Sequence, residues 1–117
     1  MRHRVEGKKF GRTKGPRELM LRNLATSVIL YERVKTTLPK AKTARMLVER
    51  LVARGKKADL GARRYLMRFL LDKNAVEKIL REFPQTYQTR QSGFTRIIKL
   101  GERAGDGAQV CFLELVK

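Results

Sequence analysis

Apolar residues near the start of the chain recur every three or four positions, which is the period of an α-helix. Pro16 suits the first turn of such a helix, and the pattern predicts that it runs from there to about residue 30. Only a narrow strip with Arg22 and Asn23 stays polar, so we expect most of this helix to be buried. Residues 32–37 follow with β-branched side chains and interspersed charges, and they are predicted to form a short strand.

A second helix is predicted from Leu38 to about residue 54, and Gly55 is a suitable end for it. Its apolar side chains fall on one stripe that we expect to face the core. The opposite face carries Lys42, Arg45, Glu49 and Arg50. Met46 and Ala53 also lie on that far face, which raises the hypothesis that they contact a partner; incidental exposure of single apolar residues is the alternative.

Two shorter helices are predicted over residues 60–71 and 73–83, with Asp59 and Asp72 as their caps and Pro84 after the second. After Gly93 the period falls to two, which predicts strands over 94–100 and 109–116 joined by a hairpin loop over 101–108. A lone hairpin is only marginally stable, so the early strand is expected to join it. The chain therefore predicts an α+β fold: a compact four-helix domain with a small mixed or antiparallel sheet of two to three strands.

Composition adds a strong charge to this outline. The 117 residues include 28 Lys and Arg against 11 Asp and Glu, a formal net charge of +17, which requires an anionic partner or tolerance of self-repulsion. The first 17 residues contain seven basic residues and one acidic residue, with glycines at positions 7, 11 and 15. Such a segment cannot bury enough surface to fold alone. We expect residues 1–15 to form a basic extended arm that is ordered only on a partner, and residues 16–117 to form a single globular α+β domain.

The residue types argue against several classes of protein. Cys111 is the single cysteine and His3 the single histidine, so neither an internal disulfide, a cysteine zinc site nor a Ser-His-Asp triad can be assembled. No apolar run approaches the roughly 20 residues that span a bilayer, and no apolar segment follows the basic N-terminus as in a signal peptide. Glu102 and Asp106 suit an exposed turn better than a metal site. We expect a soluble intracellular protein bound to an acidic partner, with no metal and no cofactor.

Nucleic acid is the acidic partner that this pattern favours. Lys and Arg contact phosphate oxygens, glycines allow close approach of the backbone, and Phe10 or His3 can stack on a base. An extended arm suits crevices in folded RNA, while the chain offers no clear recognition helix for DNA. A DNA-binding or nucleoid-type basic protein and an RNA-processing enzyme remain alternatives. The candidate RNA-binding residues are Arg2, His3, Arg4, Lys8, Lys9, Arg12, Lys14 and Arg17 of the arm and its junction, Lys40, Lys42, Arg45 and Arg50 of the second helix, and Arg90 and Arg96.

Several segments resemble the family of the seventeenth protein of the bacterial large ribosomal subunit. They are residues 1–4 (MRHR), 8–12 (KKFGR), 21–27 (LRNLATS), 32–37 (ERVKTT), 40–42 (KAK), 93–97 (GFTRI), 105–108 (GDGA) and 114–116 (ELV). The resemblance covers essentially the whole chain and is most specific in the N-terminal half. Phe10 stands where the family more often has Leu, and Ser92 where it more often has a second Gly.

This resemblance implies a structural constituent of the large ribosomal subunit, without enzymatic activity, located in the cytoplasm. Its partners would be large-subunit ribosomal RNA near the mouth of the polypeptide exit tunnel and neighbouring ribosomal proteins, with no membrane and no small-molecule substrate. Through the matching motifs, the resemblance implies that the early residues of the arm and the strip with Arg22 and Asn23 contact the RNA. The family's α+β domain with a basic N-terminal extension agrees with the elements predicted from the residues.

Overall fold

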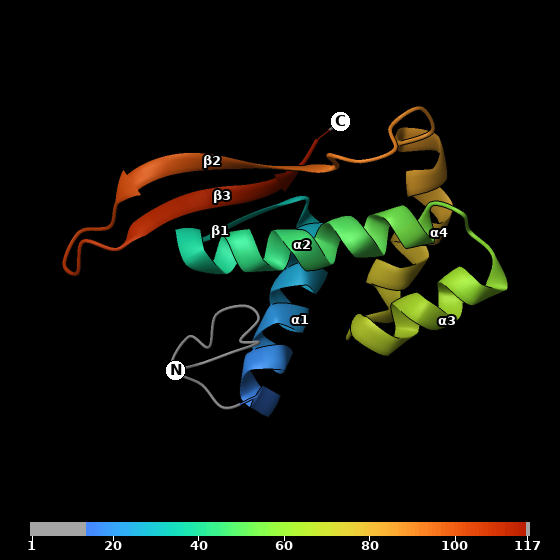
Figure 1. The fold of residues 1–117 in the computed structure, drawn as a ribbon, viewed down its shortest axis with the longest axis horizontal. Coiled ribbons are helices and arrows are strands. Elements are labelled where there is room, and N and C mark those ends of the chain that lie inside the picture. Colours follow the sequence, from blue (N-terminus) through green and yellow to red (C-terminus); the bar gives the residue numbers. More distant parts are fainter. Residues whose placement is uncertain (1–13, 117) are drawn as a thin grey trace, which may run out of the picture.

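A computed structural model of the chain describes residues 14–116 (Figure 1). The elements in chain order are α1 (Lys14–Tyr31), β1 (Arg33–Thr37), α2 (Leu38–Gly55), α3 (Leu60–Phe69), α4 (Lys73–Thr86), β2 (Thr95–Glu102) and β3 (Gln109–Leu115). The predicted α+β class, with four helices and a small sheet, is confirmed for this part of the chain. The predicted basic arm lies outside the described residues, apart from its last two positions, which form the first turn of α1.

The sheet is fully antiparallel and has the strand order β1-β3-β2. The early strand therefore joins the hairpin as predicted, and it pairs with β3, which becomes the central strand. Lys99 is paired with Cys111 and Gly101 with Val110, so Leu100 is an extra residue that forms a bulge in β2. Gly101 has a φ of +104°, which a residue without a Cβ accepts at low cost.

α2 packs along one face of the sheet, which we call the inner face (Figure 1). Alternate residues of β3, including Cys111 and Leu113, are fully buried there in one core with Val48, Leu51 and Val52 of α2. α1 and α4 complete this core with Val28, Ile29 and Ile79. α2 is therefore the central element of the domain, with its buried side against the sheet and its other side free to carry charge.

The helix ends differ from the predicted ones where tertiary packing intervenes. Asp59 and Asp72 cap α3 and α4 as predicted, accepting hydrogen bonds from the backbone N–H groups of Ala62 and Asn74 at 2.6 and 2.8 Å. α3 ends at Phe69, two residues early, because Leu70 adopts an extended backbone and is buried in the core.

The prediction that α4 ends at Phe83 before Pro84 was wrong, because the helix continues to Thr86. Pro84 lies in the last turns, where it removes only one backbone N–H donor. The extra turn buries Tyr87, whose ring packs edge-on against Phe83 and Phe94 with centroid separations of 5.3 and 5.1 Å. This aromatic packing outweighs the lost hydrogen bond.

Candidate nucleic-acid interface

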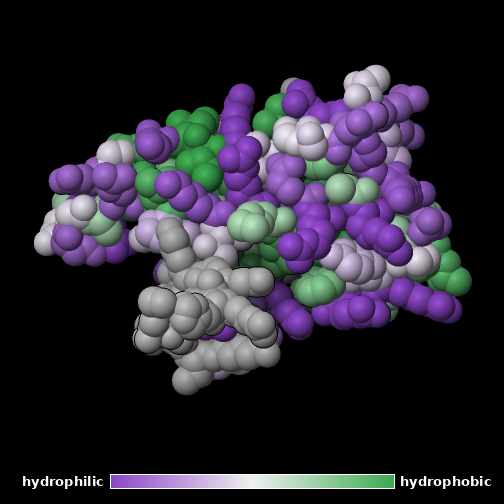
Figure 2. Space-filling view, in the orientation of Figure 1, coloured by the Kyte–Doolittle hydropathy of each residue, from purple (hydrophilic) through white to green (hydrophobic). Residues whose placement is uncertain are grey.

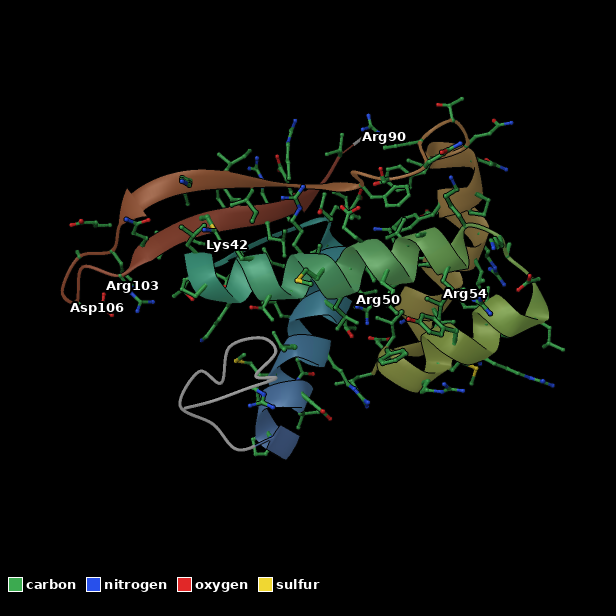
Figure 3. All side chains as sticks on the ribbon, in the orientation of Figure 1. Lys42, Arg50, Arg54, Arg90, Arg103 and Asp106 are labelled. Atoms are coloured by element: carbon green, nitrogen blue, oxygen red, sulfur yellow. The ribbon has the colours of Figure 1, made fainter. Side chains whose placement is uncertain are left out.

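The exposed side of α2 carries a row of cations. The side chains of Lys42, Arg45 and Arg50 are all exposed, and none of them forms a hydrogen bond or an ion pair with another residue in the range 14–116. Figure 3 shows Lys42, Arg50 and Arg54 distributed along the length of the helix. At a rise of 1.5 Å per residue, Lys42 and Arg50 are about 12 Å apart along the helix axis. We call Lys42, Arg45 and Arg50 the α2 cation row; Lys40 is half-buried near its start.

A shallow groove runs between this row and the edge of the sheet. Its volume is about 570 Å³, and it is lined by Lys42, Arg45, Met46, Glu49, Gly93 and Ile97. The Met46 side chain is 66% exposed, and Ala53 is exposed as well, so both lie away from the core as the helical pattern predicts. Figure 2 shows hydrophobic side chains gathered over β2 beside α2, with hydrophilic ones around them. The cation row therefore borders an apolar strip.

Glu49 lies on the polar side of α2, as the sequence places it, and lines the groove beside Lys42 and Arg45. Its carboxylate accepts hydrogen bonds from the backbone N–H groups of Gly93, Phe94 and Thr95 at 3.0, 3.1 and 2.7 Å, and from Thr95 Oγ1 at 2.6 Å. A carboxylate that accepts several backbone hydrogen bonds fixes the local path of the chain. Glu49 thus attaches the start of β2 to α2. Helical periodicity gives no signal for partners 44–46 residues away.

Two of the weaker candidates from the sequence take part in intramolecular contacts. Arg90 is exposed, donates to the Gly93 carbonyl oxygen at 3.3 Å, and accepts at its own carbonyl from Lys56 Nζ. Arg96 forms an ion pair with Glu114 on the sheet face opposite α2. The structure therefore does not bring Arg90 and Arg96 into the α2 cation row.

Glu114 is shared between Arg96 and a second arginine, Arg33, that the sequence reasoning did not single out. Arg33 Nε donates to Glu114 Oε2 at 2.8 Å, and the guanidinium carbon lies 4.3 Å from the centroid of the Phe112 ring. The hydrogen bond from Arg96 is the main cause that lowers the pKa of Glu114; burial opposes it, and the bond from Arg33 adds to it. The pattern of residues 32–37 predicts that Arg33 lies on a strand. It gives no indication that Arg33 pairs with Glu114, which is 81 residues away.

The polar strip of α1 is partly occupied by packing. Arg22 is half-buried with its guanidinium 5.6 Å from the Phe69 ring, while Asn23 is exposed and Arg17 half-buried. Lys14 lies in the first turn of α1. The other arm candidates lie outside the described residues: Arg2, His3, Arg4, Lys8, Lys9 and Arg12.

Metal-ligating side chains, the free thiol and the length of apolar helices also bear on what residues 14–116 can do. Residues 14–116 contain no cluster of three or more His, Cys, Asp or Glu side chains able to hold a metal ion. Burial raises the pKa of the Cys111 thiol, which therefore stays protonated at neutral pH. Within the same residues, no helix is both long and apolar enough to cross a membrane. Unpaired cations on a rigid helix can bind phosphate oxygens without any covalent step.

Comparison with known proteins identifies the family. The family model described as "Ribosomal protein L17" matches residues 20–116. The chain is 45% identical over 116 residues to the "Large ribosomal subunit protein bL17" of Thermodesulfovibrio yellowstonii, covering 99% of this chain and 87% of the relative. Its identity to the proteins of the same name from Syntrophus aciditrophicus and Rickettsia canadensis is 44% in each case, covering 94% and 85% of those relatives. The chain belongs to the ribosomal protein L17 family.

Proposed function

We propose that this chain binds large-subunit ribosomal RNA through its basic N-terminal arm and the α2 cation row, near the polypeptide exit tunnel and beside neighbouring ribosomal proteins. As a member of the L17 family it is a structural, non-enzymatic constituent of the large ribosomal subunit of bacteria. That membership favours rRNA over the alternatives of a DNA-binding protein and an RNA-processing enzyme. The tunnel location rests on the family resemblance.

One observation carries the role of α2. Lys42, Arg45 and Arg50 are exposed and make no ion pair within residues 14–116, and the nearby acid Glu49 is fully engaged with the backbone of β2. Charges that merely solubilise a surface are usually mixed in sign. Here a folded helix presents three exposed cations at fixed spacing, and the one acid among them, Glu49, is held by the start of β2. This arrangement suits successive phosphates of an RNA strand.

The test is a triple substitution, Lys42→Gln, Arg45→Gln and Arg50→Gln, in the full chain. Its affinity for large-subunit rRNA is measured between 50 and 200 mM salt. The plot of log affinity against log salt should lose about one unit of slope for each lost phosphate contact. The matched control removes the same charge elsewhere, through Arg64→Gln, Arg68→Gln and Arg81→Gln on α3 and α4. Equal loss in both variants would mean that net charge alone drives binding, and the role of the α2 cation row would be wrong.

The arm is tested in the same assay by deleting residues 2–13, which leaves every described element intact. The helix content measured by circular dichroism should stay nearly unchanged, while the salt slope decreases because phosphate contacts are lost. A deletion variant with the full slope would assign the phosphate contacts to the folded domain alone.

Met46 offers a test of the groove beside the cation row. Met46→Glu should leave the melting temperature of the isolated protein unchanged, because this side chain is 66% exposed. The same substitution should weaken incorporation into the subunit, because it places a carboxylate beside RNA phosphates. Normal incorporation, measured by co-sedimentation with the large subunit after a high-salt wash, would exclude Met46 from the interface.

A further inference from the structure

The geometry points to a second RNA-binding surface, on the sheet face opposite α2, where an unpaired base stacks on the guanidinium of Arg33. We call this the outer face of the sheet. The inference rests on the proposed function in that RNA is the ligand, but it uses no residue of the arm or of the α2 cation row. Its ligand class is a single-stranded RNA segment.

The strand register builds this surface from two rows of side chains. Residues directly opposite one another on neighbouring strands point to the same side of the sheet, and next-but-one residues along a strand do so too. Cys111 and Leu113 point to α2, so the residues that alternate with them point away. The first row is Arg33, Glu114 and Arg96, and the second is Lys35, Phe112 and Ile98.

Arg33 connects the two rows and is held from two sides. Its guanidinium lies over the Phe112 ring at 4.3 Å, and its Nε–H donates to Glu114, whose side chain is only 8% exposed. A guanidinium fixed in this way has lost its conformational freedom before any ligand arrives. The Arg33 side chain is nevertheless 52% exposed, so the face turned away from Phe112 is accessible. A nucleobase placed there extends the stack by one layer.

The charges of the outer face favour a polyanion. Arg33, Lys35 and Arg96 are exposed cations, and Glu114 is the one acid in the two rows. Each arginine uses a single N–H for Glu114, which leaves four of its five N–H groups for other acceptors. Phosphates on either side of a stacked base can take these donors. A paired base is already stacked within its duplex, so the site suits unpaired RNA.

The test uses the full chain and an eight-nucleotide unstructured RNA that carries one 2-aminopurine, whose fluorescence falls on stacking. Arg33→Lys keeps the charge and removes the planar guanidinium, so it should weaken binding about tenfold and abolish the quenching. The salt slope should stay as in the wild type. Arg81→Lys is the matched control, because Arg81 is also exposed and paired with a glutamate, Glu77, but contacts no aromatic ring of residues 14–116. It should change neither quantity.

The outcomes separate this inference from the proposed function. Wild-type affinity and quenching in Arg33→Lys would overturn the stacking site, as would equal effects in Arg81→Lys. The triple variant of the α2 cation row should retain the quenching while losing salt slope, so the two surfaces succeed or fail independently. If Arg33→Lys lowers the melting temperature, Phe112→Leu is the second variant. It leaves the Arg33–Glu114 ion pair intact but removes the ring that holds the guanidinium from the other side, so the quenching should decrease. Wild-type quenching in that variant too would overturn the inference.

Discussion

The two faces of the sheet are each organised by one glutamate, in different ways. On the inner face, Glu49 of α2 accepts hydrogen bonds from three consecutive backbone N–H groups at the start of β2. On the outer face, Glu114 of β3 accepts hydrogen bonds from the side chains of Arg33 and Arg96. The first carboxylate fixes where the backbone runs, and the second fixes where two side chains point. Loss of the first should therefore affect folding, and loss of the second should affect recognition before it affects folding.

The largest expected effect is on the inner face. Glu49→Gln should lower the free energy of unfolding by about 3 kcal/mol, since a neutral amide weakens four hydrogen bonds and turns an NH2 group toward N–H donors. Urea titration at pH 7 measures this. Glu82→Gln is the control, because Glu82 is exposed on α4 and makes no side-chain hydrogen bond or ion pair within residues 14–116. A loss of less than about 0.5 kcal/mol for Glu49→Gln would remove the distinction between the two carboxylates.

The second largest effect is expected at high pH, where ionisation of Tyr87 should lower the stability of the domain. Tyr87 packs behind Phe94 and its hydroxyl is buried without a hydrogen-bond partner in residues 14–116. Burial, and then the charge of Glu32, raise the pKa of Tyr87 from 10.0 to about 12. Because the folded pKa is the higher one, this contribution to stability is complete below pH 10 and is lost as the pH rises through 12.

The wild type should therefore lose about 1 kcal/mol more per pH unit between pH 10 and 12 than Tyr87→Phe does. At pH 7 the variant should be as stable as the wild type or slightly more so, because it removes an unsatisfied buried hydroxyl. Chemical denaturation across this pH range is the measurement. Parallel curves for the two proteins would show that the phenol ionises as easily when folded as when unfolded.

A smaller effect is expected at low pH, where protonation of Glu114 on the outer face should lower the stability of the domain. The pKa of Glu114 is lowered from its usual 4.5, first by the hydrogen bond from Arg96, so its contribution to stability is present above pH 4.5 and is lost as the pH falls through the lower folded pKa. Glu114→Gln should cost about 1 kcal/mol at pH 7, because both arginines remain solvated, and should flatten the decline of Tm below pH 4.5. A cost as large as that of Glu49→Gln would make both glutamates structural.

The smallest effect is expected outside both faces. Asp106 and Arg103 form an exposed ion pair at the tip of the β2–β3 hairpin (Figure 3). The hydrogen bond from Arg103, followed by that from the Ala108 N–H, lowers the pKa of Asp106 from 3.8 to about 2. Since both side chains are solvated, Asp106→Asn should leave Tm at pH 7 unchanged within error. A clear decrease in Tm would mean that the hairpin tip supports the sheet.

Most of the features that could be predicted from the sequence depend on residues within about four positions of one another. The caps Asp59 and Asp72, the core stripe of α2 and the exposed cations opposite it are of this kind. The exception is the third strand of the sheet, which is predicted because a lone hairpin is only marginally stable. Extension of α4 past Pro84 could not be predicted, because Tyr87 and Phe94 meet only in the folded chain. The same holds for the partners of Glu49 and for the Arg33–Glu114 ion pair, which join distant segments.

The strand order determines when the outer face can exist during synthesis of the chain. Arg33 belongs to β1, yet the ring on which it lies and the carboxylate that holds it both belong to β3, the central strand and the last of the three to be translated. Until residues 109–115 leave the ribosome, β1 and β2 have no strand between them to pair with. Strand pairing over such a sequence separation forms slowly. A nascent chain that stops before β3 therefore carries Arg33 but lacks the Phe112 ring and the Glu114 carboxylate that hold it. RNA stacking on this face is thus restricted to chains that have been translated through β3.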